Sequence, residues 1–252
     1  DMGLGKTLQA LVLLALYRDQ VPQSSRKPSL IIAPSGLLKN WLKEVDTHLG
    51  NKGLGNILEA HGSGLRGLKA IGVTGRDIDK GVSVLDSARL AQADVILTTY
   101  ESLSDYQISF AQVSFGFIVF DEIQKVKNPT SLISKSAATV NGKFCIGLSG
   151  TPVENSLADL WTILDVLAPG LLNFSLRDFL KLFSGDPEQQ DSKLALERLQ
   201  SQLVDTVDGN VPLILRRMKD EVFKDAGPNG KPMPSKIIVP SDQTSQIMPS
   251  HQ

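Results

Sequence analysis

Several features that would assign a protein to a class at once are scarce in this sequence of 252 residues. Cysteine occurs once, at Cys145, which excludes an internal disulfide and a zinc site built on several thiolates. The longest uninterrupted apolar run covers residues 10–17, whereas a membrane-spanning helix needs roughly 18 such residues. No basic segment with an apolar run and a small-residue cleavage site opens the chain. These absences predict an intracellular protein that does not associate with membranes.

An excess of charge of either sign is also missing. The 26 Lys and Arg residues nearly balance the 27 Asp and Glu residues, giving a net charge of −1. No global basic excess indicates a nucleic-acid-binding protein, although a local patch could still bind DNA. Apolar residues make up 41% and charged residues 21%, as is typical of globular proteins with a real core. Composition therefore predicts one large domain or two small ones and gives no activity.

Short apolar runs alternate with segments of helical periodicity. Strands are predicted at residues 29–33, 94–98, 117–120 and 144–148. Helices are predicted at residues 8–17, 37–49, from 101 onward, 157–167, 176–182 and 194–207. This alternation is typical of an α/β fold with a parallel sheet covered by helices on both faces. In such folds ligands bind beyond the carboxyl ends of the strands. Residues 50–75 are rich in glycine and predict loops around short strands.

The first seven residues contain the end of a P-loop, the pattern GxxxxGK[ST]. Its glycines let backbone N–H groups turn around phosphates, Lys6 can reach the β- and γ-phosphates, and Thr7 offers a hydroxyl to Mg²⁺. The alternative is a chance Gly-Lys-Thr at the start of a helix. The residues predicted to bind the nucleotide are Asp1, Met2, Gly3, Leu4, Gly5, Lys6 and Thr7.

A second motif makes the first one specific. The apolar run at residues 117–120 ends in Asp121 and Glu122, which is the Walker B pattern. Asp121 would hold Mg²⁺, and Glu122 would orient or deprotonate the attacking water. The alternative is an acidic pair that merely caps a strand. Together the two motifs predict a nucleotide hydrolase that binds ATP and Mg²⁺, with Lys6, Asp121 and Glu122 as its catalytic residues.

The motifs, taken in order, resemble those of superfamily-two helicases, and specifically those of the Swi/Snf-type double-stranded-DNA translocases. Residues 1–7 and 121–124 are similar to motifs I and II of that family. Further similarities lie at residues 32–35 with 40–44, 97–100, 127–129, 148–152 with 154–161, and 215–219. The family usually has a small residue where this chain has Ile123, a change that we expect to be tolerated.

The resemblance implies a RecA-like P-loop NTPase lobe with a C-terminal helical extension. On this basis residues 1–172 are the ATP-binding lobe, truncated at its N-terminus inside motif I. Residues 173–235 are its helical extension, and residues 236–252 are a linker or tail towards a missing second lobe. In the family that second lobe supplies arginines to the nucleotide site. We therefore expect hydrolysis by the chain alone to be very slow or absent.

The resemblance also implies roles for residues that motifs I and II do not include. Pro34, Ser35, Thr99 and Tyr100 are candidates to contact DNA phosphates, with ordinary helix capping as the alternative for each. The residues that would couple the nucleotide site to DNA are Gln124, Ser149, Gly150 and Thr151, with a local turn or cap as the alternative. Trp41 lies on an apolar helical face, and packing in the core is its favoured interpretation.

The function implied is ATP-driven movement on double-stranded DNA that remodels a protein–DNA complex, with sequence-nonspecific backbone contacts. The partners implied are the duplex and a second RecA-like lobe of the same full-length chain. The alternative is a non-catalytic module of the same fold that binds nucleotide or DNA. The protein would be cytoplasmic in a bacterium and nuclear in a eukaryote. The absence of histone-binding or nuclear-import features favours the bacterium.

Overall fold

The structure, a computed structural model, describes residues 5–50, 53–150, 157–172 and 175–183. The described residues up to Leu180 belong to one compact unit. The last residues of the final described helix, from Lys181, belong to a second unit, and the rest of that unit lies outside the described residues. Among the described residues, no helix combines the length and the apolar character needed to cross a bilayer.

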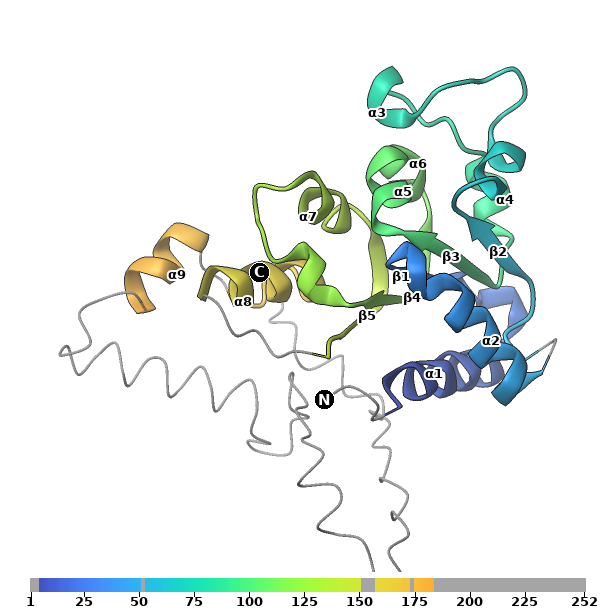
Figure 1. Ribbon diagram of the computed structural model, residues 1–252, viewed down its shortest axis with the longest axis horizontal. Helices are drawn as coiled ribbons and strands as arrows, with labels where there is room; N and C mark the ends of the chain where they lie inside the picture. Colours follow the sequence, from blue (N-terminus) through green and yellow to red (C-terminus); the bar gives the residue numbers. More distant parts are fainter. Residues whose placement is uncertain (1–4, 51–52, 151–156, 173–174, 184–252) are drawn as a thin grey trace, which may run out of the picture. The chain divides into compact units, whose positions relative to one another are not determined.

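A parallel sheet organises the larger unit (Figure 1). Among the described residues it has five strands, in the order β2-β3-β1-β4-β5. The strands are β1 (Ser29–Ala33), β2 (Ile57–Ala60), β3 (Val95–Thr99), β4 (Ser114–Asp121) and β5 (Asn141–Leu148). Every neighbouring pair is parallel, so all the strands end at one edge, here called the carboxyl edge.

The four predicted strands are confirmed, and three of them have bounds that differ from the predicted ones. β1 has the predicted bounds. β3 is shifted by one residue from the prediction, and the Asp94 carboxylate just before it accepts the backbone N–H of Asn56 at 2.8 Å. β4 and β5 begin earlier than predicted, with Ser114 paired to Asn141.

One face of the sheet is covered by α1 (Lys6–Gln20) and by α2 (Leu38–Leu49), which follows the 3-10 turn η2 (Ser35–Leu37). Leu11 and Leu14 of α1 and Trp41 of α2 pack there against Ile31 and Val119 of the central strands. The spacing of the buried residues Leu38, Trp41 and Val45 confirms the helical period predicted for α2.

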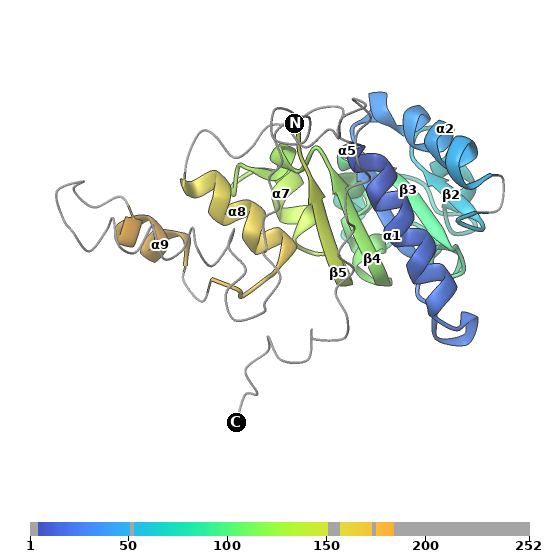
Figure 2. The same ribbon diagram turned by 90° about the horizontal axis from the view of Figure 1, so that it is seen from below.

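The other face carries shorter helices. They are α4 (Ser87–Ala91), α5 (Tyr100–Asp105), α6 (Gln107–Ala111), α7 (Leu132–Ala137) and α8 (Leu157–Leu167), together with the 3-10 turns η3 (Gly64–Leu68) and η4 (Ile123–Val126). Leu30 and Ile32 of β1 and Ile118 of β4 point to this side, alternating with the residues that face α1 and α2. Figure 2 shows α1 and α8 on opposite sides of β4 and β5. Burial on both faces explains why the central strands are continuous apolar runs.

The remaining elements are η1 (Gln23–Ser25), α3 (Asp77–Lys80) and α9 (Leu176–Phe183). The glycine-rich stretch contains the short strand β2, as predicted, and also the 3-10 turn η3, which was not predicted. The helix predicted at residues 176–182 is confirmed as α9. The helix predicted at residues 194–207 lies outside the described residues, and the domain bounds at 172 and 235 stay predictions.

Candidate nucleotide site

The start of α1 is built to receive an anion at the carboxyl edge. Gly5 is the N-cap and has φ +71°, a left-handed conformation that L side chains rarely adopt. Lys6 and Thr7 follow in the first turn and are half-buried. That described turn carries no acidic side chain, and the positive end of the helix dipole there favours an anion such as a phosphate. Of the predicted P-loop residues, 1–4 lie outside the described residues.

β4 brings the acidic pair to the same edge and gives its two carboxylates different surroundings. Asp121, the last residue of the strand, is only 7% exposed. Glu122 is half-buried and has φ +53°, and among the described residues it is the one non-glycine with a positive φ. Such a conformation costs on the order of 1–3 kcal/mol and persists where the surrounding structure imposes it. The turn at Glu122 therefore aims this side chain away from the course of the strand.

Two buried donors from other elements hold Asp121. The indole Nε1 of Trp41, on α2, donates to Oδ2 of Asp121 at 2.8 Å. The hydroxyl of Tyr100, the first residue of α5, donates to the backbone carbonyl of Asp121 at 2.8 Å. Helical spacing correctly predicts that Trp41 packs in the core, where it is 1% exposed. No spacing in the sequence indicates its bond to a residue 80 positions away.

The electrostatic setting of Asp121 suits a cation. Burial raises the pKa of its carboxyl above the ordinary value, and the hydrogen bond from Trp41 lowers it. The Glu122 carboxylate raises this pKa further, while the Glu122 backbone N–H and the Lys6 ammonium lower it. A buried carboxylate gains from a positive partner, and oxygen donors such as this carboxylate and the Thr7 hydroxyl are those that Mg²⁺ prefers. The residues present therefore fit a magnesium ion.

Three of the four predicted coupling residues are among the described residues, and two of them are hydrogen-bonded in a chain that reaches Glu122. Ser149, just after β5, donates from its hydroxyl to Oε1 of Gln124 at 2.9 Å. Gln124, in η4, donates from Nε2 to Oε2 of Glu122. The structure thus joins Glu122 to the segment after β5 through one amide side chain. Gly150 follows Ser149 and is half-buried, and Thr151 lies outside the described residues.

The four candidates for DNA contact lie at the carboxyl ends of β1 and β3 or directly after them, and they differ in exposure. Ser35 is exposed and Pro34 is half-buried, at the start of η2. Thr99 is buried and caps α5, accepting the N–H of Ser102 at 3.0 Å. The Tyr100 side chain is 0% exposed. Ordinary capping, the alternative interpretation, therefore describes the Thr99 hydroxyl, and the Tyr100 ring faces inward.

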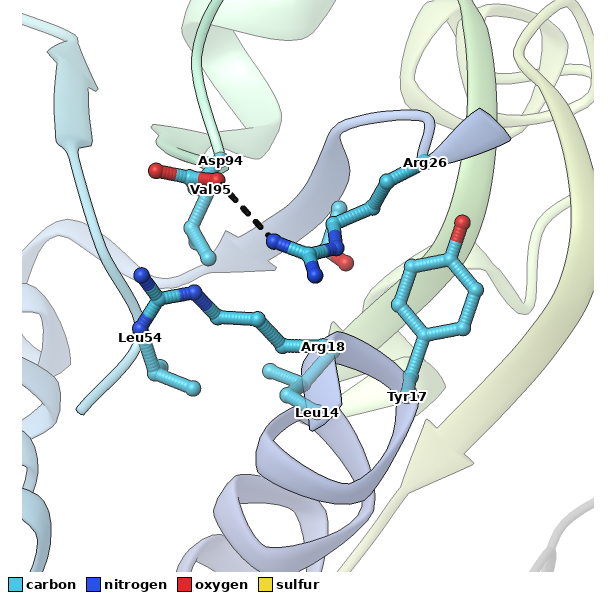
Figure 3. A pocket seen from close by; sticks show the side chains of 8 residues that line it. Leu14, Tyr17, Arg18, Arg26, Leu54, Asp94 and Val95 are labelled. Carbon is cyan, nitrogen blue, oxygen red and sulfur yellow. Dashed lines mark ion pairs between the residues drawn. The ribbon is translucent and has the colours of Figure 1, made fainter. Parts of the chain in front are cut away.

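A shallow hollow at the opposite edge has a structural role. Figure 3 shows Arg18 and Arg26 on the side of Asp94, which pairs with Arg26 at 3.9 Å, and Tyr17 on the far side of Arg26. Arg18 also donates to the backbone carbonyl of Gly53 at 2.9 Å. The Arg18 bond joins the end of α1 to the segment before β2, and the Arg26–Asp94 pair joins the segment before β1 to the start of β3. Asp94 already supplies the anion that the two arginines face.

A parallel α/β sheet with a P-loop lysine opening one helix and an acidic pair ending a strand defines a P-loop NTPase lobe. The chain belongs to the SNF2-related domain family, whose model matches residues 1–237. This confirms the resemblance found in the sequence, and membership of this family implies ATP binding.

The curated relatives are much longer than this chain. The chain is 38% identical to the Zorya protein ZorD of Escherichia coli over 246 residues, which cover 96% of the chain and 21% of ZorD. It is 30% identical to an uncharacterized ATP-dependent helicase of Mycoplasma pneumoniae over 253 residues, which cover 100% of the chain and 20% of that protein. The chain therefore spans about a fifth of the length of the curated relatives it matches.

A solved structure confirms the fold. The SWI2/SNF2 ATPase core of Sulfolobus solfataricus in complex with double-stranded DNA superposes with a TM-score of 0.60 and 32% identity. The match covers 80% of this chain and 36% of that one.

Proposed function

We propose that this chain is the ATP-binding lobe of an ATP-dependent double-stranded-DNA translocase that remodels protein–DNA complexes. The observation that carries the proposal is the placement of the two motifs: Lys6 opens α1, Asp121 ends β4, and the charge of Lys6 acts on the Asp121 carboxyl. In this proposal the lysine and the acidic pair bind the same nucleotide. Membership of a family of ATP-dependent proteins supports the same reading.

Each residue of the site has a role in this proposal. Lys6 and the N–H groups at the start of α1 bind the phosphates. Thr7 and Asp121 hold Mg²⁺, which when bound neutralises charge on the phosphate oxygens. Glu122 orients the attacking water and accepts its proton. Gln124 and Ser149 hold Glu122 in place and connect it to the segment after β5.

The duplex would lie along the carboxyl edge, near the segments that follow β1 and β3. The Sulfolobus relative was solved with double-stranded DNA, which supports this partner. Ser35 offers an exposed hydroxyl to a phosphate, and the contacts carry no base sequence information. Because the Tyr100 side chain is buried, a contact at this residue would use its backbone. A second lobe of the same full-length chain would complete the nucleotide site with arginines.

Equilibrium titration with a fluorescent ATP analogue tests the proposal. We expect this chain to bind the analogue in the presence of Mg²⁺, and Lys6→Ala to remove most of that binding because the phosphates lose their positive partner. Lys43→Ala, which removes an exposed positive charge from α2, is the matched control and should bind normally. Equal affinity in Lys6→Ala and in the unchanged chain would contradict the assignment of the site.

A further inference from the structure

The strongest feature that the motif assignments leave unexplained is the pair of buried hydrogen bonds that meet at Asp121. One donor reaches its side chain and the other its backbone. The donors come from two different elements, α2 and α5, on opposite faces of the sheet. Both side chains are among the largest that the structure buries completely. Asp121, the residue that would hold the metal, therefore accepts a hydrogen bond from each of the two faces of the sheet.

The Trp41 bond constrains how the Asp121 carboxylate can turn. The terminal torsion of an aspartate is broad, so an unconstrained carboxylate turns over a wide range. Here Oδ2 accepts the indole N–H of Trp41 at 2.8 Å, and Oδ1 accepts the neighbouring N–H of Glu122 at 3.1 Å. An indole N–H only donates, so Trp41 can hold a carboxylate oxygen and cannot compete for a cation. The bond fixes one oxygen and with it the direction of the other.

The Tyr100 bond constrains the backbone of the same residue. Its hydroxyl donates to the Asp121 carbonyl at 2.8 Å, immediately before the left-handed turn at Glu122. At neutral pH a tyrosine hydroxyl keeps its proton and can donate this hydrogen bond. The peptide unit that joins the two acidic residues is thereby held just before the left-handed conformation of Glu122.

The two hydrogen-bond donors, Trp41 and Tyr100, also lie next to the segments that contain the candidate DNA-contact residues. Trp41 lies in the first turns of α2, directly after η2 with Ser35. Tyr100 opens α5, directly after the capping residue Thr99. Each of these segments therefore sends one buried side chain to Asp121.

We infer that Trp41 and Tyr100 are positioning residues that orient Asp121 for Mg²⁺, each linking one candidate DNA-contact segment to the metal carboxylate. This inference rests on the proposed function, because it presumes that Asp121 holds the metal. It assigns no catalytic contact to either side chain. Hydrogen-bonding partners of metal ligands typically change metal affinity by about 10- to 100-fold when they are removed.

The test measures how much Mg²⁺ strengthens nucleotide binding in the intact protein that carries this chain. The affinity for a fluorescent ATP analogue is measured in EDTA and in saturating Mg²⁺, and the ratio of the two is the metal effect. Trp41 is replaced site-specifically by 3-benzothienylalanine, which keeps the bicyclic shape and has sulfur in place of the N–H. Tyr100→Phe removes the other donor and keeps the ring.

We expect each substitution to reduce the metal effect by about 10-fold while leaving the affinity in EDTA within about 2-fold. Combining either one with Asp121→Asn should reduce the metal effect no further than Asp121→Asn alone, because both act through that carboxylate. Tyr106→Phe is the matched control for Tyr100, since Tyr106 is a buried tyrosine at the other end of α5. Val45→Ala controls for lost packing on the buried face of α2. Both controls should keep the full metal effect even where they lower the unfolding temperature.

The outcomes separate this inference from the proposed function. No metal effect in the unchanged protein would overturn the metal site itself. A normal metal effect in the unchanged protein and in both donor variants would overturn the positioning role alone. If the Trp41 replacement prevents folding, the comparison of Tyr100→Phe with Tyr106→Phe decides the matter, and an equal metal effect in those two variants overturns the inference.

Discussion

At the scale of single residues, Asp121 and Glu122 are consecutive in the chain, yet the structure gives them different surroundings. Asp121 is buried and accepts the Trp41 indole N–H, close to the charge of Lys6. Glu122 turns into the left-handed region and accepts the amide of Gln124. The first setting suits a fixed metal ligand, and the second suits a carboxylate that handles a water molecule.

Substituting each acid separately tests this division. In the intact protein we expect Glu122→Gln to lower DNA-stimulated ATP hydrolysis by about 10²- to 10⁴-fold with nearly unchanged ATP affinity, because the amide cannot accept a proton. Asp121→Asn should weaken Mg²⁺-dependent ATP binding as well as turnover. Nucleotide titration and steady-state hydrolysis measure the two effects. Loss of ATP binding in Glu122→Gln with retention in Asp121→Asn would reverse the two roles.

Cys145 allows a second test at this scale, because it is the only thiol in the sequence. It lies in β5, and burial raises its pKa from the ordinary value of 9.0 to about 11. Since the thiolate is the reactive form, its fraction at pH 8 should be about 100-fold lower than in an exposed cysteine, at tenfold per pKa unit.

Alkylation rates between pH 6 and 9 measure this effect. The rate in the folded protein should rise about tenfold per pH unit without levelling off, since the whole range lies below the raised pKa. The same protein unfolded in urea is the control, and its rate should begin to level off near pH 8.5–9. A plateau below pH 9 in the folded state would contradict the raised pKa.

At the scale of elements, the covering of β4 by α1 depends on a glycine. A Cβ added at Gly116 would lie 1.9 Å from the Tyr17 hydroxyl oxygen and 2.4 Å from the ring carbon that bears it. That hydroxyl accepts the Lys27 N–H at 3.2 Å and donates to the Lys27 carbonyl at 3.3 Å. The end of α1 is thereby anchored to the segment before β1, and Gly116 provides the space for it.

Gly116→Ala should therefore destabilise the fold. Overpacking of this kind typically costs about 1–3 kcal/mol of unfolding free energy, because side chains and backbone must shift. Gly67→Ala, at a glycine where a Cβ would meet nothing within 4 Å, is the matched control and should change stability by no more than about 0.5 kcal/mol. Urea denaturation of both variants measures the difference. An equal midpoint for both would show that α1 moves aside without cost.

At the scale of the whole molecule, the proposed reaction needs stabilisation of charge beyond what the described site provides. The described site provides a lysine, a hydroxyl and two carboxylates around the nucleotide position. Charge that develops on the γ-phosphate is stabilised in related phosphoryl-transfer systems by an arginine from outside the lobe, worth about 10³ to 10⁵ in rate. The chain spans about a fifth of its curated relatives, which have room for such a partner.

We accordingly expect residues 1–252 alone to bind ATP and to show no hydrolysis stimulated by double-stranded DNA. The intact protein should show that stimulation. Phosphate release is measured with and without duplex DNA for residues 1–252 alone and for the intact protein. Glu122→Gln in the intact protein gives the rate of phosphate release without catalysis. Robust DNA-stimulated ATP hydrolysis by the 252-residue chain alone would contradict the expectation that an arginine from outside this lobe is needed.

The sequence by itself determined the parts of this protein that depend on neighbouring residues. The bounds of β1, the helical period of α2, and the motifs around Lys6 and Asp121 were all predicted without coordinates. Strands buried on both faces read as continuous apolar runs, and helices that cover them repeat their apolar residues every three or four positions. Local chemistry also marks a phosphate loop and an acidic strand end.

Only the tertiary structure decided which distant side chains meet. The sequence offers Tyr100 to DNA and Trp41 to the core, whereas the fold brings both to Asp121. Placing β1 between β3 and β4 brings α2, which follows β1, and α5, which follows β3, to the end of β4. The periodicity of the sequence does not predict this order of strands, because contacts across a parallel sheet join residues separated by whole strand–helix units.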